Sequence, residues 1–582
     1  MINIKLKNFS QNPISKSRRR YKEVQAMRVN FNYEASSTHT AYLVNQREMG
    51  KSLLRLSTGM RILEASDDAA GLFIADQLSI VATGLQEGNR NISTGISALR
   101  IAENAAGQIF DRLRGIYSRA IRAANDINDP NARAALQREV ANLTDAIQKI
   151  GTDTEYNGIK LLDGTFQNKY IHYGARMDQV VNVSIADVRA QSLGAHIAQG
   201  LGATFTSSST TTGGTLTNLL NTTSAPPGAL GVAGADNFRL DGGDYVRING
   251  ATVYQNTSTA AADRRLVDAA TLAKNINENA NLKAIGIEAK AVNISVANAY
   301  TSPITASVSG TPTGTATISL NFYVGDGTKV INIDDFASVS GSSVTTMGLD
   351  QLVSQINSQA SARGVPIVAM NDGGRLKLVT TNGETIAIEA KVDASTVTFA
   401  ASDSLTVNIN YSQLLEGAST TAVSHTVNGS SDTRYSAAVK VGRITIAANE
   451  TFNLAYSGVS GTDIGLNFDI ASGSSATFSN LYTIDLSTNA RAERALMIVS
   501  KALQKVDTIR SQIGATMNNL QSIFDAQKVG YDNTKQAENV IRNTDYAEEM
   551  SNFTTLQIKM QSTIAMLAQA NALPQLVLQL LR

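Results

Sequence analysis

The sequence lacks cysteine and tryptophan altogether, and aromatic residues make up only 5% of its 582 residues. Without cysteine the chain can form no disulfide, no thiolate nucleophile and no zinc–thiolate site. Large enzymes usually anchor their cores with more aromatic surface than this. The chain is also too long for a single core, so we expect several domains. A protein of this kind that works outside the cell must be stabilised by packing or by assembly.

Motifs of catalysis are missing as well. The sequence has only four histidines, and none of them begins an HExxH motif: His39, His172, His196 and His425. No GxSxG, no P-loop and no strand-associated GxGxxG is present. The neighbouring carboxylates Asp67 and Asp68 read as a turn with a helix cap rather than as a catalytic pair. We therefore expect a protein that is not an enzyme and has no catalytic, cofactor or metal site.

Long apolar runs are absent too. No run reaches the roughly 18–20 residues that cross a bilayer, and the basic start is not followed by the apolar core of a secretory signal. The net charge of the whole chain is +1, although residues 1–26 are strongly basic. This segment has neither interleaved aromatic residues nor amphipathic spacing. We expect no membrane insertion, no nucleic-acid partner and a specialised route if the chain is exported.

Both ends of the chain carry helical periodicity. Apolar or alanine residues recur at steps of three and four from Ile92 to Ala123, which predicts one helix of about 32 residues. Asp129 and Pro130 fit the cap and first turn of a second helix that ends at Gly151. A third stripe has heptad spacing, and three narrow stripes favour an antiparallel coiled-coil bundle over three unrelated helices. The predicted bundle core is Ile92, Ile96, Leu99, Ile109, Leu113, Ile116, Leu136, Val140, Leu143, Ile147, Val506, Ile509, Ile513, Leu520 and Ile523.

The middle of the chain, residues 196–485, has a different composition. It is rich in small and polar residues, with short alternating segments and turn signals that are typical of strands. Within it, residues 272–277 (LAKNIN) resemble residues 352–357 (LVSQIN), and each segment follows a strand pair and precedes another strand. We interpret these as two ββαβ repeats, about 240–293 and 320–389. The predicted fold class is α+β multidomain, with a coiled-coil bundle formed by both chain ends and a β-rich central insertion.

Three segments resemble motifs of a known family, the bacterial flagellins. They are residues 55–71 (RLSTGMRILEASDDAAG), which resemble the N-terminal signature, residues 156–162 (YNGIKLL), which resemble the end of the second long helix, and residues 568–582, which resemble the C-terminal "AQAN…LLR". The likeness covers about 27–195 and 486–582. The central region is where this family varies freely.

The resemblance implies a division of the chain into layers of a filament. Terminal helices at 27–66 and 545–582 would form the inner core, the bundle with a β-hairpin at 67–195 and 486–544 would form the outer tube, and 196–485 would be a variable exposed region. Terminal segments of this kind are too narrow to bury their apolar residues alone, so we expect them to become ordered against neighbouring subunits. The expected contact residues are Leu53, Leu56, Met60, Leu63, Phe553, Leu556, Met560, Ile564 and Leu567.

The function implied by the resemblance is that of a structural subunit, exported and polymerised into the extracellular flagellar filament for swimming motility. The implied partners are other subunits, an export chaperone, the type III export apparatus, and hook-associated junction and cap proteins. No cofactor is implied. Two alternatives stay open. One is a hook–filament junction protein, which shares the helical ends, and the other is an adhesin displayed on the filament through residues 196–485.

Recognition by the mammalian Toll-like flagellin receptor is expected to be weak. Flagellins that the receptor recognises carry an Arg and a Leu in the first long helix, and the matching positions here are Gly115 and Arg119. Only Glu139, in the second helix, matches a further contact position. Losing the Arg and burying a new charge would both weaken docking.

Residues 1–26 are expected to lie outside the mature subunit. Met27 stands in the same relation to Leu56 as the initiating Met of flagellins does to the corresponding Leu, and residues 29–32 (VNFN) resemble the family's beginning. Residues 22–24 (KEV) are also what a ribosome-binding sequence encodes when it is read in frame. We therefore expect the start at Met27, and a genuine export extension is the alternative.

Overall fold

The computed structural model describes residues 32–125, 129–207, 238–240, 242–256, 265–429, 432–457 and 465–580. The chain divides into two compact units. The first comprises residues 1–93, 172–180 and 522–582, and the second comprises residues 94–171 and 181–521. We expect residues 1–26 to be absent from the mature subunit, and this segment lies outside the described residues.

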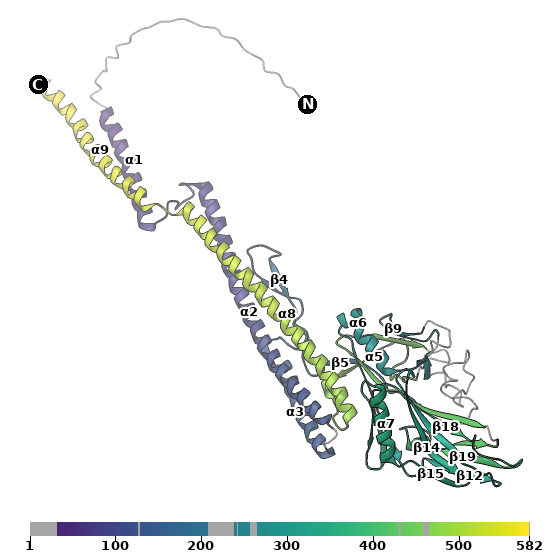
Figure 1. Cartoon of the computed structure of the whole chain (residues 1–582). Helices are drawn as coiled ribbons and strands as arrows, with labels where there is room; N and C mark the ends of the chain where they lie inside the picture. Colours follow the sequence, from purple (N-terminus) through teal and green to yellow (C-terminus); the bar gives the residue numbers. More distant parts are fainter. Residues whose placement is uncertain are drawn as a thin grey trace, which may run out of the picture. The chain divides into compact units, whose positions relative to one another are not determined.

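Long helices come from the two ends of the chain (Figure 1). They are α1 (Tyr33–Thr58), α2 (Ala69–Ala123), α3 (Pro130–Asp153), α8 (Asn489–Arg542) and α9 (Tyr546–Leu580). The residues between α3 and α8 are mostly strands, with the short helices α5 (Ala269–Glu278), α6 (Ala280–Ala284) and α7 (Leu349–Arg363). Helical ends around a β-rich centre confirm the predicted fold class.

The helix α2 is longer than the sequence pattern predicted. The predicted start at Ile92 was wrong, because the helix begins at Ala69 and has 55 residues. No proline interrupts residues 69–91. The Oδ1 atom of Asp68 accepts a hydrogen bond from the backbone N–H of Gly71 at 2.9 Å. This cap starts the helix directly after the preceding turn.

The helix α3 begins as predicted. Oδ1 of Asp129 accepts a hydrogen bond from the N–H of Ala132 at 2.7 Å, and Pro130 occupies the first turn. The end of the helix differs, because α3 continues past Gly151 to Asp153. The predicted role of Gly151 as a helix terminator was therefore wrong.

By length and composition, α2 could cross a bilayer, and no other helix among the described residues meets that criterion. A single such helix is weak evidence of a membrane span, because the core helices of soluble proteins pass the same test. The expectation that the chain does not insert into a membrane stays a prediction.

Two six-stranded antiparallel sheets dominate the central residues of the second unit. The first contains, in spatial order, β16 (Ile367–Asn371), β17 (Arg375–Thr380), β11 (Glu288–Ala299), β22 (Arg443–Ala448), β5 (Gly194–Gly200) and β25 (Thr477–Asn480). The second contains β15 (Ser343–Thr346), β14 (Lys329–Ser340), β13 (Ala316–Val324), β18 (Ile386–Asp393), β21 (Thr433–Lys440) and β6 (Thr204–Thr206). Two hydrophobic cores fill this region, one including Leu272 and Ile276 of α5 and the other including Leu352 and Ile356 of α7.

Smaller sheets complete the described strands. One holds β12 (Ile304–Ser309), β19 (Ser404–Ile409) and β20 (Val423–Val427), and another holds β24 (Ser474–Ser475), β23 (Asn453–Ser457), β8 (Tyr245–Ile248) and β9 (Ala251–Gln255). Two-stranded pairs are formed by β10 (Arg265–Leu266) with β7 (Arg239–Leu240), by β1 (Glu155–Tyr156) with β2 (Ile159–Lys160), and by β3 (Lys169–His172) with β4 (Val180–Val183).

The two ββαβ segments share a hydrogen-bond pattern. Nδ2 of Asn277 in α5 donates to the carbonyl of Ala289 at 2.7 Å, and its Oδ1 accepts from the N–H of Ala289 at 2.9 Å. Asn357 of α7 makes the same two bonds with Ala369, at 2.9 and 2.8 Å. In both copies the asparagine therefore joins the helix to the strand that follows it, which supports the interpretation as a repeat.

The two copies do not form separate sheets. The long strand β11, which ends the first copy, pairs with β22 through Glu288–Val292. It then pairs with β17 of the second copy through Asn293–Ala299. One continuous strand therefore belongs to both copies.

Replacing Asn277 or Asn357 by alanine should destabilise the central region. Each substitution leaves the buried backbone of Ala289 or Ala369 without its side-chain partner, which typically costs about 1–3 kcal/mol. As a matched control, the exposed Asn281 forms no side-chain hydrogen bond within the described residues, so Asn281→Ala should cost less than ~0.5 kcal/mol. Denaturant unfolding of the purified chain measures all three. Equal unfolding midpoints for Asn277→Ala and Asn281→Ala would contradict the assigned role.

Candidate assembly surface

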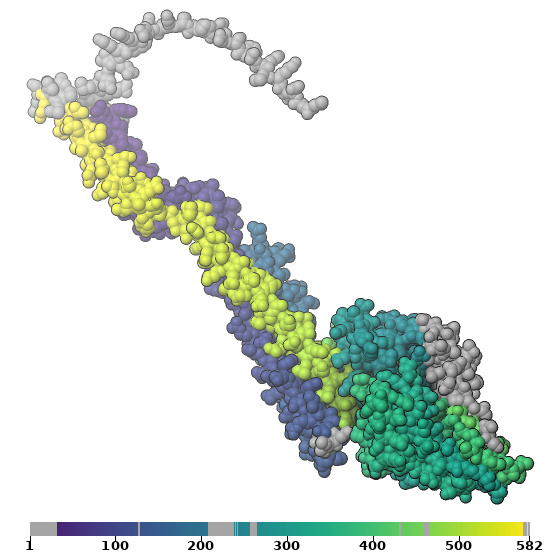
Figure 2. Space-filling model, in the orientation of Figure 1, coloured from purple at the N-terminus to yellow at the C-terminus, as the bar shows by residue number. Residues whose placement is uncertain are grey.

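In the first unit, α1 and α9 lie side by side (Figures 1 and 2), and they run antiparallel (Figure 1). At one end, Nδ2 of Asn32 donates to the carbonyl of Ala570 at 2.9 Å. At the other end, the N–H of Thr544 donates to the carbonyl of Gly59 at 3.0 Å. Between them, Nδ2 of Asn45 donates to Oγ1 of Thr563 at 3.1 Å. These contacts set the register of the pair.

Buried and half-buried side chains on each helix recur at steps of three and four, and they form the seam of the pair. On α1 the seam is Ala35, Thr38, Tyr42, Asn45, Met49, Ser52 and Leu56. On α9 it is Glu549, Phe553, Leu556, Met560, Thr563, Leu567 and Ala570. The seam positions Thr38, Asn45 and Ser52 on α1, which lie seven residues apart, are thus polar. The hydroxyl of Ser52 is buried without a hydrogen-bond partner among the described residues. A seam with this many polar groups stabilises a helix pair only weakly.

Several large apolar side chains outside the seam are exposed on both helices. On α1 these are Leu43, Val44, Leu53 and Leu54, and on α9 they are Met550, Ile558, Ile564, Met566 and Leu573. We call these nine residues the outer apolar face. Exposed apolar surface of this extent marks a site of interaction with other molecules.

The nine contact residues predicted from the sequence divide between the seam, the outer apolar face and a turn. Leu56, Phe553, Leu556, Met560 and Leu567 lie in the seam, and Leu53 and Ile564 lie in the outer apolar face. Met60 and Leu63 are not helical, so the expectation that they continue the terminal helix was wrong. The cause is Gly59, whose φ of 72° ends α1 in the left-handed conformation.

The turn after α1 connects it to α2 and is held by Asp67. The carboxylate of Asp67 accepts hydrogen bonds from the N–H groups of Leu63 and Glu64 at 3.3 and 3.4 Å. It also pairs with Lys51 at 3.5 Å and Arg55 at 3.7 Å. Burial alone would raise the pKa of Asp67, but these hydrogen bonds and charges lower it below its ordinary value. Together with the cap that Asp68 provides, these contacts confirm the predicted turn and helix cap.

A stripe of small residues on α2, which the sequence analysis did not identify, accommodates the segment around β3. In the first unit, a Cβ on Gly84 would lie 2.5 Å from that of Ala175, and a Cβ on Gly88 would lie 1.9 Å from the carbonyl oxygen of Tyr173. In the second unit, Gly95 similarly faces Ile171. Glycine is unfavourable within a helix, so glycines at steps of four and seven were the signal for a close backbone approach.

In the second unit, α2, α3 and α8 form an antiparallel bundle. Arg119 of α2 pairs with Glu139 of α3 at 2.5 Å, and Nδ2 of Asn489 at the start of α8 donates to the carbonyl of Ala124 after α2. Of the predicted core residues in both units, three are half-buried: Ile96, Leu143 and Ile523. The others are buried: Ile92, Leu99, Ile109, Leu113, Ile116, Leu136, Val140, Ile147, Val506, Ile509, Ile513 and Leu520.

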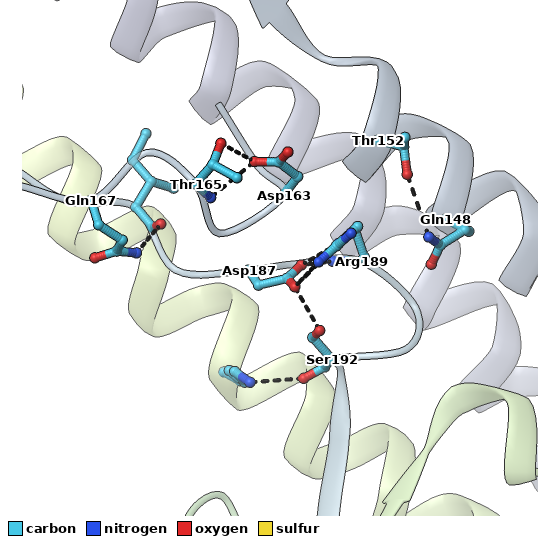
Figure 3. A network of polar contacts seen from close by, with 10 residues as sticks. Gln148, Thr152, Asp163, Thr165, Gln167, Asp187, Arg189 and Ser192 are labelled. Atoms are coloured by element: carbon cyan, nitrogen blue, oxygen red, sulfur yellow. Dashed lines mark hydrogen bonds and ion pairs between the residues drawn. The ribbon is translucent and has the colours of Figure 1, made fainter. Parts of the chain in front are cut away.

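A polar network fixes the chain between the bundle and β5 (Figure 3). The carboxylate of Asp187 pairs with Arg189 at 2.7 Å and accepts from the hydroxyl of Ser192 at 2.7 Å. Burial alone would raise the pKa of Asp187, but its hydrogen bonds to Arg189 and Ser192 lower it. Nζ of Lys505 in α8 donates to the carbonyl of Ser192 at 2.8 Å. This network joins the bundle to the first strand of the β-rich region.

A second contact joins α8 to the sheets. The side chain of Lys501 is only 3% exposed, and its Nζ lies 3.0 Å from Oε2 of Glu288, the first residue of β11. A buried lysine would be destabilising without such a partner. The second unit therefore holds the start of β11 directly on α8.

Comparison with known proteins points to one family. The N-terminal helical region of bacterial flagellin matches residues 29–167, and the C-terminal helical region of bacterial flagellin matches residues 496–581. The flagellin of Aquifex aeolicus strain VF5 is 46% identical over 566 residues, which are 96% of this chain and all of that protein. The flagellin of Aquifex pyrophilus is 45% identical, with the same shares covered. The solved structure of FliC from Burkholderia pseudomallei is 15% identical, covers 73% of this chain and 99% of its own, and has a TM-score of 0.25, which is too low to support an argument.

Replacing Gly88 by alanine should destabilise the first unit. The added Cβ would collide with the Tyr173 carbonyl, and overpacking of this kind typically costs about 1–3 kcal/mol. At Gly514, which lies in α8, nothing lies within 4 Å of the added Cβ. Gly514→Ala should therefore stabilise its helix by up to ~1 kcal/mol. Thermal unfolding of the monomer and hydrogen exchange at residues 172–180 measure the difference, and a Gly88→Ala protein that melts at or above Gly514→Ala would refute the contact.

Proposed function

Since the chain belongs to the bacterial flagellin family and is a structural subunit of the flagellar filament, we propose that the outer apolar face of α1 and α9 makes the contacts between subunits. The observation that carries this proposal is the distribution of apolar residues around α9. One set packs on α1, and another set is exposed. Large apolar side chains that stay exposed beside an already packed seam are typical of a surface that other molecules cover.

The energetics favour burial by other subunits over a stable isolated pair. Fully burying one Leu, Ile or Met side chain stabilises by about 1.5–3 kcal/mol. Ile558 and Met566 are 59% and 62% exposed, so most of this stabilisation is unrealised in the single chain. The polar seam between α1 and α9 contributes little in its place. Each added copy would therefore gain stability that no single chain has, which is the driving force for polymerisation.

The same arrangement suggests roles for the other parts. The bundle core would keep the subunit folded, and residues 196–485 would remain outside the contacts of the inner core. We propose that the exposed face of α9 also binds an export chaperone before assembly. Delivery by the type III export apparatus to an extracellular filament, and contact with hook-associated junction and cap proteins, complete the proposal.

A charge placed on the outer apolar face should stop polymerisation without unfolding the chain. Ile558→Glu removes an exposed apolar side chain, so we expect less than ~0.5 kcal/mol change in monomer stability. In a packed interface the same charge would lack a partner and cost several kcal/mol. Val368 in β16 is 48% exposed and provides a matched control, because Val368→Glu makes the same change in the central region.

Seeded polymerisation followed by sedimentation distinguishes the two variants. We expect filaments from Val368→Glu and none from Ile558→Glu at the same subunit concentration. Filaments of normal length and yield from Ile558→Glu would show that this face is not an interface.

We also propose weak recognition by the mammalian Toll-like flagellin receptor. Glu139, the one matching contact position, is occupied by its ion pair with Arg119. Gly115 provides no side chain where recognised flagellins carry an arginine. In a receptor reporter assay the chain should activate poorly, and Arg119→Leu, which frees Glu139, should activate better. Full activation by the unmodified chain would contradict the proposal.

A further inference from the structure

A cavity in the second unit lies between the first turns of α8 and the strands β5, β11 and β22. Its volume is about 480 Å³. Six cationic side chains line it, against the two carboxylates of Glu416 and Glu493: Lys290, Lys377, Lys440, Arg443, Arg491 and Arg494. The net charge of the whole chain is only +1, so this lining concentrates positive charge.

Two of these cations are already neutralised. Lys440 pairs with Glu416, and its Nζ also donates to the carbonyl of Ile294 at 3.0 Å. Arg491 pairs with Asp485 at 2.6 Å. Neither side chain is available as the main ligand of an added anion.

Three other cations have no carboxylate partner within the described residues. The side chains of Lys290 in β11 and Arg443 in β22 form neither a hydrogen bond nor an ion pair within those residues. Nη2 of Arg494 in α8 donates to the hydroxyl of Ser479 at 3.1 Å, but its Nε is buried without a partner. Burial without a hydrogen bond is costly for a guanidinium N–H. The unmatched donors therefore come from two walls of the cavity, the sheet and the helix.

Lys440 and Arg443 bring two positive charges close together in the lining of the cavity. Burial lowers the pKa of Lys440 from the ordinary value, and the neighbouring charge of Arg443 lowers it further, although Glu416 acts in the opposite direction. An anion in the cavity would relieve this repulsion between like charges.

We propose that the cavity binds a phosphate or sulfate group, held by Lys290 and Arg443 from the sheet and by Arg494 from α8. A guanidinium matches the oxygens of phosphate and sulfate with two parallel N–H donors, which favours this class of anion. The cavity is within the roughly 300–1,000 Å³ of pockets that hold small organic molecules. The group is therefore carried by a larger molecule, such as a sulfated or phosphorylated sugar. This binding site does not depend on polymerisation.

Calorimetric titration of the monomeric full chain tests the proposal at constant ionic strength. The probes are inorganic phosphate, inorganic sulfate, N-acetylglucosamine 6-sulfate and the unsulfated sugar. We expect the sulfated sugar to bind and the unsulfated sugar not to bind. Arg443→Gln and Arg494→Gln should each weaken binding by about tenfold or more. Lys283→Gln removes an exposed lysine of α6 that does not line the cavity, and should leave binding unchanged.

Comparing the sulfated sugar with the inorganic ions distinguishes a site for a sulfate or phosphate ester from a site for the free anion. Tighter binding of the sulfated sugar than of the inorganic ions would establish an ester site, and equal binding would establish a site for the oxyanion alone. Circular dichroism checks that each variant is folded. If Arg494→Gln unfolds through loss of the Ser479 contact, the exposed pair Lys290→Gln and Arg443→Gln decides the question. Binding that is absent, or is the same in Arg443→Gln as in Lys283→Gln, overturns the proposal.

Discussion

The structure depends on the packing of the last helix, α9. Its seam packs on α1 of the same chain, but its other large apolar side chains are left exposed. The seam of α9 packs on α1, where Thr38, Asn45 and Ser52 occupy positions that a stable coiled coil would fill with apolar residues. Stronger packing here would satisfy the single chain and weaken its dependence on other copies. Under the proposed subunit contacts, a weak internal seam together with an exposed outer apolar face would couple folding of the ends to assembly of the filament.

The bundle of α2, α3 and α8 and the terminal pair of α1 and α9 differ in how far their apolar side chains are buried within the chain. In the bundle, Leu113, Ile147 and Val506 are completely buried by helices of the same chain, so its stability is a property of the subunit. In the terminal pair several large apolar residues remain exposed, so under the proposed subunit contacts its stability would depend on the filament. The turn in which Asp67 forms ion pairs with Lys51 and Arg55 connects α1 of the terminal pair to α2 of the bundle.

Much of this architecture could be predicted from local patterns, because heptads, caps and turn residues act over a few positions. The cap at Asp129 and the stripe at Val506–Ile523 are examples. The start of α2 was predicted wrongly, because the residues before Ile92 include glycines such as Gly84 and Gly88, which disfavour a helix by local propensity although they are helical here. Met60 and Leu63 were assigned to the terminal helix on spacing alone, and one left-handed glycine overrides that spacing. The cationic cavity could not be predicted at all, because Lys290, Arg443 and Arg494 are brought together only by the strand order and by the packing of the sheet on α8.

The strand β11 connects α8 to the sheets of the central region, residues 196–485. Its first residue is fixed to α8 through Lys501, its first half is bonded to β22, and its second half is bonded to β17. Direct contacts therefore run from α8 through β11 to both β22 and β17. When the filament rotates through a viscous medium, drag on the outer modules would load the hydrogen bonds of β11 in shear and pass to α8 as torque. Under the proposed arrangement, residues 196–485 would then rotate rigidly with α8.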